Sequence, residues 1–265
     1  DMRLAEAMLK EFLSRIGIRP SVLKRSFTVF SVPCGASAKL REDYAALAEE
    51  CGLKRLCFVE APFLAALGAD AVLSEANPVF CLDIGGGVTN AAVLSLDGII
   101  AGLSMNVGGN NMDANIIDRI EACKGLHIGA LTAERVKNEI GSLAVGARGA
   151  TVVEGSLVSA MRPGSVSVQA SEIEPCIRIY IDKILEYASL VLQKLPAEVA
   201  AAVNGNGVYL SGGVVKLSFV PEYIAKKLDM RIHVCDEPQF AVVTGGGAAV
   251  RDERILGRIA KGTDD

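Results

Sequence analysis

The sequence predicts an α/β fold in which a parallel α/β layer is followed by an antiparallel meander. Three observations predict it. Strands and helices alternate over the first 74 residues, three strands joined by tight turns follow, and glycine clusters stand at strand ends. Strand–helix alternation is typical of a parallel sheet covered by helices, whereas tight turns join antiparallel strands. The chain therefore combines both kinds of strand pairing.

The first part of the chain predicts two parallel strands with helices around them. Apolar residues recur at helical spacing over 4–16, and a charged amphipathic helix is expected over 40–51. Apolar, β-branched runs predict strands over 27–32 and 55–60. An alanine-rich helix over 62–73 has proline in its first turn, where proline is tolerated.

The remainder predicts an antiparallel meander followed by helix-rich sequence. The meander strands are expected over 79–84, 88–96 and 99–106. The later elements expected from the same signals are helices over 132–143 and 171–195, a strand pair near 150–154 and 165–169, and strands over 208–210 and 232–235.

Composition and charge exclude several classes of protein. The 265 residues are 51% hydrophobic and 22% charged, as in globular chains with a sizeable core. The net charge of −4 gives no basic footprint, so no nucleic-acid partner is expected. Seven scattered cysteines without a C-x-x-C pair fit a reducing, cytoplasmic compartment. No apolar run has the length of a membrane span, and no signal peptide is visible.

Glycine clusters follow several predicted strands. The four clusters are Gly85–Gly87, Gly108–Gly109, Gly212–Gly213 and Gly245–Gly247, and none matches a Walker loop or G-x-G-x-x-G. A single glycine turn is equally well explained by the freedom of glycine to adopt positive φ. Ligands of open α/β sheets bind outside strand ends, and successive N–H groups there attract anions. Four such turns favour a nucleotide held largely by backbone.

Six segments in colinear order carry a family resemblance. They are "VPCGASAKLREDYAALAEECGLKRLCFVEAPFLAALGA", "LDIGGGVTNAAVLSLDGII", "SMNVGGNNMDANIIDRI", "IGALTAERVKNEIGSL", "VYLSGGVVKLSFVPEYI" and "VCDEPQFAVVTGGGAAV". They resemble the MreB family of bacterial actins, within the superfamily of actin, sugar-kinase and heat-shock-chaperone ATPases. The resemblance implies an actin-like ATPase fold, in which two RNase H-like domains flank a nucleotide cleft.

The same resemblance implies a domain division. Residues 1–74 would be the remainder of the first domain, and residues 75–250 the second domain, with a helical subdomain at about 114–200. Residues 251–265 would form a C-terminal helix. The first domain would be incomplete, because the family's first phosphate loop would lie upstream of residue 1. Either a reduced domain or a fragment explains this, and the starting Asp1 favours a fragment.

Site residues follow from the resemblance position by position. Asp83 would hold the water shell of Mg²⁺, and Lys137 and Glu139 would face the adenine and ribose of ATP or ADP. The residues expected to surround the phosphates and adenosine are Gly85, Gly86, Gly87, Val88, Thr89, Gly108, Gly109, Gly212 and Gly213. Without the resemblance, Lys137 and Glu139 fit a solvated helix face, and Asp83 fits a turn cap.

The glutamate pair expected before a proline is altered. The chain reads Glu60-Ala61-Pro62, which places Ala61 where the family has its water-orienting glutamate. Positioning or deprotonating the water contributes about 10²–10⁴-fold to a rate. Glu60 replaces this group only if the register slips by one, and adjacent strand residues face opposite sides. We therefore expect ATP binding with weak hydrolysis at most.

A basic loop has two interpretations. Val22 and Leu23 stand between Arg19 and the Lys24–Arg25 pair, which suits shallow insertion into an anionic inner leaflet. The alternative is an ordinary loop whose Leu23 packs on the core.

The resemblance implies a filament of identical protomers that works with membrane proteins of cell-wall elongation and determines cell shape. The protein would be cytoplasmic and peripheral at the inner face of the membrane. The alternatives are a non-hydrolysing paralogue that co-assembles with an active bacterial actin, and a kinase-type enzyme of the same superfamily. A chaperone ATPase would need a substrate-binding domain after the last helix.

Overall fold

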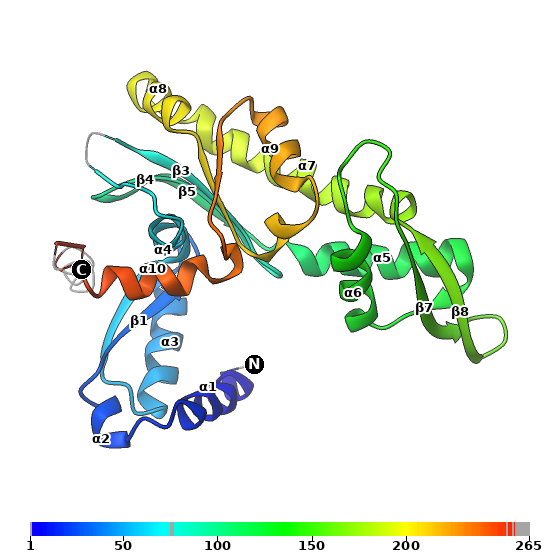
Figure 1. Ribbon diagram of the computed structural model, residues 1–265. Coiled ribbons are helices and arrows are strands. Elements are labelled where there is room, and N and C mark those ends of the chain that lie inside the picture. Colours follow the sequence, from blue (N-terminus) through cyan, green and yellow to red (C-terminus); the bar gives the residue numbers. More distant parts are fainter. Residues whose placement is uncertain (1, 75–76, 253, 256, 258–265) are drawn as a thin grey trace.

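The computed structural model describes residues 2–74, 77–252, 254–255 and 257. Within these residues the strands form a two-stranded, a five-stranded and a three-stranded sheet, and Figure 1 shows them spread along an extended molecule. No helix in the described part of the chain has the length and apolar character needed to cross a bilayer. Part of the predicted C-terminal helix over 251–265 lies outside the described residues.

The two-stranded sheet confirms the first predicted strand pair. Strand β1 (Phe27–Val32) runs parallel to β2 (Arg55–Glu60), and Phe27 lies opposite Arg55. The helices around it are α1 (Met2–Ile16), α2 (Pro20–Leu23) and α3 (Ala38–Glu50). The hydroxyl oxygen of Ser37 accepts a hydrogen bond from the Leu40 N–H group at 3.3 Å and so caps α3.

The five-stranded sheet carries the predicted meander. Its strands, in spatial order, are β10 (Ile232–Val234), β9 (Val208–Ser211), β3 (Val79–Ile84), β4 (Thr89–Ser95) and β5 (Gly98–Met105). The pairs β3–β4 and β4–β5 are antiparallel, whereas β3–β9 and β9–β10 are parallel. Every residue of β3 and β4 is buried, because helices cover both faces of the sheet. This environment explains the continuous apolar runs of these strands.

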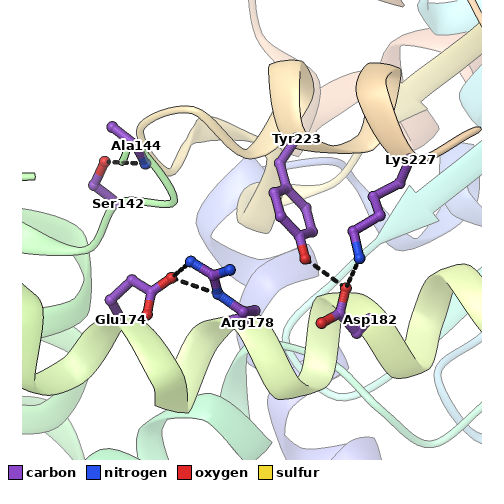
Figure 2. Close-up of polar contacts among 7 residues, drawn as sticks. All are labelled: Ser142, Ala144, Glu174, Arg178, Asp182, Tyr223 and Lys227. Atoms are coloured by element: carbon purple, nitrogen blue, oxygen red, sulfur yellow. Dashed lines mark hydrogen bonds and ion pairs between the residues drawn. The ribbon is translucent and has the colours of Figure 1, made fainter. Parts of the chain in front are cut away.

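Helices α7 (Ala170–Gln193) and α9 (Val220–Leu228) cover one face of this sheet, and polar contacts join them. The Tyr223 hydroxyl donates to Asp182 Oδ1 at 2.6 Å, and Lys227 Nζ lies 3.4 Å from the same oxygen (Figure 2). The Tyr223 ring also lies 5.7 Å from the Arg178 guanidinium. Cations over an aromatic face are attracted by its quadrupole, so this contact also stabilises the packing of α7 against α9.

A separate core lies in the outer unit formed by the three-stranded sheet. The elements of this unit are β6 (Leu126–His127), β7 (Ala150–Leu157), β8 (Arg162–Gln169), α5 (Gly109–Lys124) and α6 (Ala130–Ile140). Ile116, Val136, Val153 and Ile173 are all fully buried in its core. The region expected as a helical subdomain therefore also contains a three-stranded antiparallel sheet.

The prediction that Gly245–Gly247 forms a turn at a strand end is wrong. These glycines lie inside α10 (Ala241–Ala249), which packs against α4 (Ala61–Gly68). A Cβ atom on Gly245 would stand 1.8 Å from the Leu64 carbonyl oxygen, and one on Gly68 would stand 1.9 Å from that of Ala241. The glycines therefore serve a close crossing of two helix backbones rather than a turn.

Other helices also differ from prediction. Helix α4 ends at Gly68 instead of continuing to residue 73, because the chain turns at Asp70, whose φ is 57°. Helix α8 (Ala197–Asn206) was not predicted, and it includes the first part of the "NGNG" segment. The other described elements are the short 3₁₀ helices η1 (Gly213–Lys216) and η2 (Pro238–Phe240).

Candidate functional site

The candidate site begins at the end of β3, where Asp83 is buried. Its carboxylate accepts two neutral hydrogen bonds: the Ser211 hydroxyl donates to Oδ1 at 2.9 Å, and the Asn90 amide donates to Oδ2 at 3.2 Å. Burial raises the pKa of Asp83, and the two hydrogen bonds act in the opposite direction. A carboxylate held in this way is oriented but not neutralised, so it retains affinity for a cation.

The glycine turn after Asp83 is joined to the start of α5. The Gly109 N–H group donates to the Gly85 carbonyl at 3.0 Å, and the Asn110 N–H group donates to the Gly86 carbonyl at 2.8 Å. The Gly85 N–H group itself bonds to the Val88 carbonyl at 3.0 Å. These bonds use neither the Gly86 nor the Gly87 N–H group, and both residues are exposed. The turn therefore exposes the Gly86 and Gly87 N–H groups, while its hydrogen bonds to α5 hold it in place.

The steric surroundings of the glycines divide them into two groups. A Cβ on Gly108 would stand 2.4 Å from the Gly85 carbonyl oxygen, and one on Gly212 would stand 2.1 Å from the Ile84 carbonyl oxygen. Gly212 also has φ of +88°, so the fold itself requires these two glycines. A Cβ on Gly87 would have only a 3.9 Å contact, and one on Gly213 would meet nothing within 4 Å. Packing therefore does not require glycine at positions 87 and 213, and both positions have free space beside the turn.

A cavity of about 460 Å³ opens beside this turn. Its lining residues come from the glycine turn, α5, α6 and the segments around η1 and η2: Gly86, Gly109, Asn110, Glu134, Lys137, Asn138, Gly213, Val214, Lys216, Leu217 and Gln239. Backbone, amides, two lysines and a carboxylate outnumber apolar groups, as expected for a polar, charged ligand. Its volume lies within the range of about 300–1,000 Å³ typical of small-molecule sites.

One wall of the cavity contains a buried ion pair. Lys137 Nζ lies 2.8 Å from Asp113 Oδ2 and donates to the Gly109 carbonyl at 3.1 Å. The two residues are 5% and 7% exposed. Asp113 Oδ1 is buried without a hydrogen-bond partner among the described residues. Sequence reasoning identified Lys137 but missed Asp113, although an acidic residue on the apolar face of α5 is the signal of a buried charge.

The structure does not bring Glu139 into the cavity. Its carboxylate accepts hydrogen bonds from Arg135 at 2.8 Å and from the Thr151 hydroxyl at 3.0 Å, and it is absent from the lining. Residues two apart on a helix do not share a face, whereas residues three or four apart do. Glu134, three positions before Lys137, therefore lines the cavity with it, and this spacing could have identified Glu134. Asn138, four positions after Glu134, also lines the cavity.

The remaining predicted site residues lie around this centre. Val88 is half-buried, and the buried Thr89 hydroxyl donates to the Val107 carbonyl at 2.7 Å, so this side chain braces the turn. Glu60 ends β2, and its Oε1 accepts from the Gly35 N–H group at 2.6 Å. Ala61 begins α4 and is 8% exposed. No hydrogen bond joins Glu60 to the glycine turn in the residues that the structure covers.

The predicted membrane loop is a short helix. Val22 in α2 is 50% exposed, whereas Leu23 is half-buried. Arg19, Lys24 and Arg25 are exposed. The structure thus offers one exposed apolar side chain, Val22, among three cations. The half-buried Leu23 agrees in part with the alternative of an ordinary loop whose Leu23 packs on the core.

The residues present fit a magnesium–nucleotide ligand. The described chain has no group of three or more His, Cys, Asp or Glu side chains that could hold a metal ion alone. Mg²⁺ commonly keeps several waters and takes one or two carboxylates plus substrate phosphates. A single oriented carboxylate, Asp83, two positions before an exposed glycine turn matches that pattern.

Comparison with known proteins identifies the fold. The chain is 29% identical over 257 residues to "Cell shape-determining protein MreB" of Escherichia coli K12. This alignment covers 94% of this chain and 72% of that protein. The crystal structure of MreB5 of Spiroplasma citri bound to AMPPNP matches with a TM-score of 0.90 at 26% identity, covering 99% of this chain and 78% of that chain. A MamK double helical filament shares the fold, with a TM-score of 0.79 at 19% identity over 95% and 76% of the two chains.

The structure is thus an α/β actin-like fold, as expected from the sequence. The family model for MreB/Mbl protein matches residues 1–257, and the chain belongs to the MreB/Mbl family.

Proposed function

We propose that the chain binds ATP or ADP with Mg²⁺ in the cavity beside the glycine turn. The observation that carries this proposal is the cavity lined by Gly86 and Gly213, at the exposed glycine turn that follows the buried Asp83 in the chain. The relation to a protein of this fold that was solved with AMPPNP supports it.

Roles for the lining residues follow from their chemistry. The Gly86 and Gly87 N–H groups would donate to the phosphate tail, because successive backbone amides form an anion site. Asp83 would hold magnesium through water, and the metal would neutralise phosphate charge. Glu134 and Asn138 offer an acceptor and an amide toward the base and ribose, and the Lys137 ammonium, paired with Asp113, holds the Gly109 carbonyl in the wall.

The proposed biological role is that of a filament protein that determines cell shape. The curated relative is named as cell shape-determining, and one protein of this fold forms a double helical filament. Two domains, 1–74 and 75–250, would flank the nucleotide, so that bound nucleotide biases their closure and the contacts between protomers. The α2 segment, with Val22 and its flanking cations, would place filaments on the inner leaflet beside proteins of wall elongation.

A second candidate is a paralogue that binds nucleotide, hydrolyses it slowly or not at all, and co-assembles with an active family member. Ala61 cannot orient water, and the Glu60 carboxylate is occupied by the Gly35 N–H group at 2.6 Å. This geometry favours the second candidate over a kinase-type enzyme, which also needs a group to activate its acceptor hydroxyl.

The nucleotide proposal is tested by Gly86→Val and calorimetric titration with Mg-ATP. A Cβ on Gly86 would stand 3.1 Å from Asn110 Oδ1, and the larger valine would fill the space over the turn. We expect at least a tenfold loss of affinity, which corresponds to about 1.4 kcal/mol. Gly205→Val is the control, because a Cβ there would meet nothing within 4 Å. Parental affinity in a folded Gly86→Val protein would remove the basis of the proposal.

The filament proposal is tested by electron microscopy on anionic lipid monolayers with Mg-ATP. Filaments lying on the lipid are expected, and Val22→Glu should detach them without preventing assembly. Filaments seen only after addition of an active family member would establish the second candidate. Nucleotide binding without any assembly would contradict both.

A further inference from the structure

We propose that Asn90 is a positioning residue that holds the Asp83 carboxylate and the turn between β1 and α3 in one arrangement, and thereby connects the magnesium–nucleotide site to the two-stranded sheet. This inference rests on the proposed nucleotide binding.

Both ends of the Asn90 amide are engaged. The side chain lies on β4, is 4% exposed, and donates from Nδ2 to Asp83 Oδ2 at 3.2 Å. Its Oδ1 accepts from the Cys34 N–H group, 56 positions earlier in the chain, at 3.1 Å. A planar amide bonded at both ends has a single orientation, so a shift of the Cys34 backbone is passed to the Asp83 carboxylate.

The connection continues to the end of β2. The next N–H group along the turn, that of Gly35, donates to Glu60 Oε1 at 2.6 Å. Adjacent amides of one turn therefore bond to opposite sides, one to the five-stranded sheet and one to the two-stranded sheet. This path runs from Asp83 through Asn90, Cys34 and Gly35 to Glu60.

Ser211 also bonds to the Asp83 carboxylate and can therefore be compared with Asn90. Its hydroxyl donates to the other Asp83 oxygen, Oδ1, at 2.9 Å. Ser211 thus helps to orient the same carboxylate, but it lies on β9 and has no bond to the Cys34 turn among its described contacts. Removal of either donor should weaken magnesium binding, whereas only removal of Asn90 should release the turn.

The expected size of the effect follows from metal sites in general. Loss of a hydrogen-bond partner behind a metal ligand typically costs 10–100-fold in metal affinity. Asp83 would act through water, so we expect the lower end of that range. A purely structural role for Asn90 would lower stability without changing the effect of magnesium on nucleotide binding.

The test compares Asn90→Leu, Ser211→Ala and the control Ser95→Ala, at a buried position near the other end of β4. ATP affinity is measured by calorimetry in excess Mg²⁺ and in EDTA, and exchange of the Cys34 amide is measured by residue-resolved hydrogen exchange. Asn90→Leu should reduce the magnesium-dependent gain in affinity about tenfold. It should leave affinity in EDTA near the parental value, and it should deprotect the Cys34 amide.

The other variants separate the outcomes. Ser211→Ala should reduce the magnesium-dependent gain while the Cys34 amide stays protected, and Ser95→Ala should change neither. A parental magnesium gain, or a protected Cys34 amide, in Asn90→Leu overturns the inference. If Asn90→Leu does not fold, Asn90→Ala serves instead. It removes both hydrogen bonds without adding apolar bulk or charge, so an unchanged magnesium gain there overturns the inference. A parent protein that binds no ATP refutes the proposed function itself, and this inference with it.

Discussion

The Lys137–Asp113 pair is a buried ion pair in the wall of the cavity, so loss of one partner should lower stability. Lys137→Met would leave the Asp113 carboxylate buried without its cation, which typically costs about 3–5 kcal/mol. We expect a loss of that size in the free energy of unfolding, measured by urea denaturation. Arg135→Met is the control, because its exposed pair with Glu139 should contribute at most about 1 kcal/mol. Equal losses in the two variants would mean that the buried pair has no special weight.

Cysteine reactivity tests the burial of Cys34 beside the Asn90 amide. Desolvation, with a smaller effect of the Glu60 carboxylate, raises the pKa of the Cys34 thiol to about 12. The thiolate is the reactive form, so this thiol should stay inert at pH 8 and gain no reactivity as the pH rises to 9.5. Iodoacetamide labelling followed by mass spectrometry should modify the exposed Cys123 first and Cys34 only after unfolding. Labelling of Cys34 at the rate of Cys123 would contradict the described packing.

At the residue scale, the sequence could predict which glycines matter but not why. Glycine is required at positions 108 and 212 because a Cβ there would clash with a carbonyl oxygen, whereas Gly213 faces open space. Those carbonyls belong to Gly85 and Ile84, which are distant from Gly108 and Gly212 in sequence, so only the folded chain separates the two cases. Lys137 was predicted through a resemblance, and Glu134, three positions before it, could then have been predicted from helix spacing.

At the element scale, the crossing of α4 and α10 gives a matched pair of variants. Gly245→Ala places a Cβ 1.8 Å from the Leu64 carbonyl oxygen, so the helices must separate. Overpacking of this kind typically costs about 1–3 kcal/mol, occasionally more. Gly246→Ala, one position along α10, meets nothing within 4 Å and should stabilise the helix by up to about 1 kcal/mol. Thermal or urea unfolding measures both, and a Gly245→Ala protein as stable as Gly246→Ala would contradict this packing.

The strands were easier to predict than the helix ends. Strands β1, β2 and β3 begin and end where their apolar, β-branched runs do, because turn residues delimit those runs. Helix α10 was missed because three consecutive glycines disfavour a helix locally, and tertiary contact with α4 overrides that preference. Helix α8 was missed because its last turn consists of asparagine and glycine, which usually indicate a loop.

At the scale of the whole molecule, two of the described contacts illustrate how the two-stranded sheet is joined to the five-stranded sheet. One is the tight α4–α10 crossing, and the other is the hydrogen-bonded path through Asn90. The residues that line the cavity come from the glycine turn of the five-stranded sheet, from α5 and α6 of the outer unit, and from the segments around η1 and η2. The arrangement of the three sheets depends on contacts between distant segments, so the sequence predicted it only through the family resemblance.

The most direct test of the central claim is an experimental structure of the protein with Mg²⁺ and a non-hydrolysable ATP analogue. We predict the phosphate tail against the Gly86 and Gly87 N–H groups, magnesium water-bridged to Asp83, and the base toward Glu134 and Asn138. A nucleotide bound elsewhere, or a cavity left empty at saturating analogue, would contradict the account.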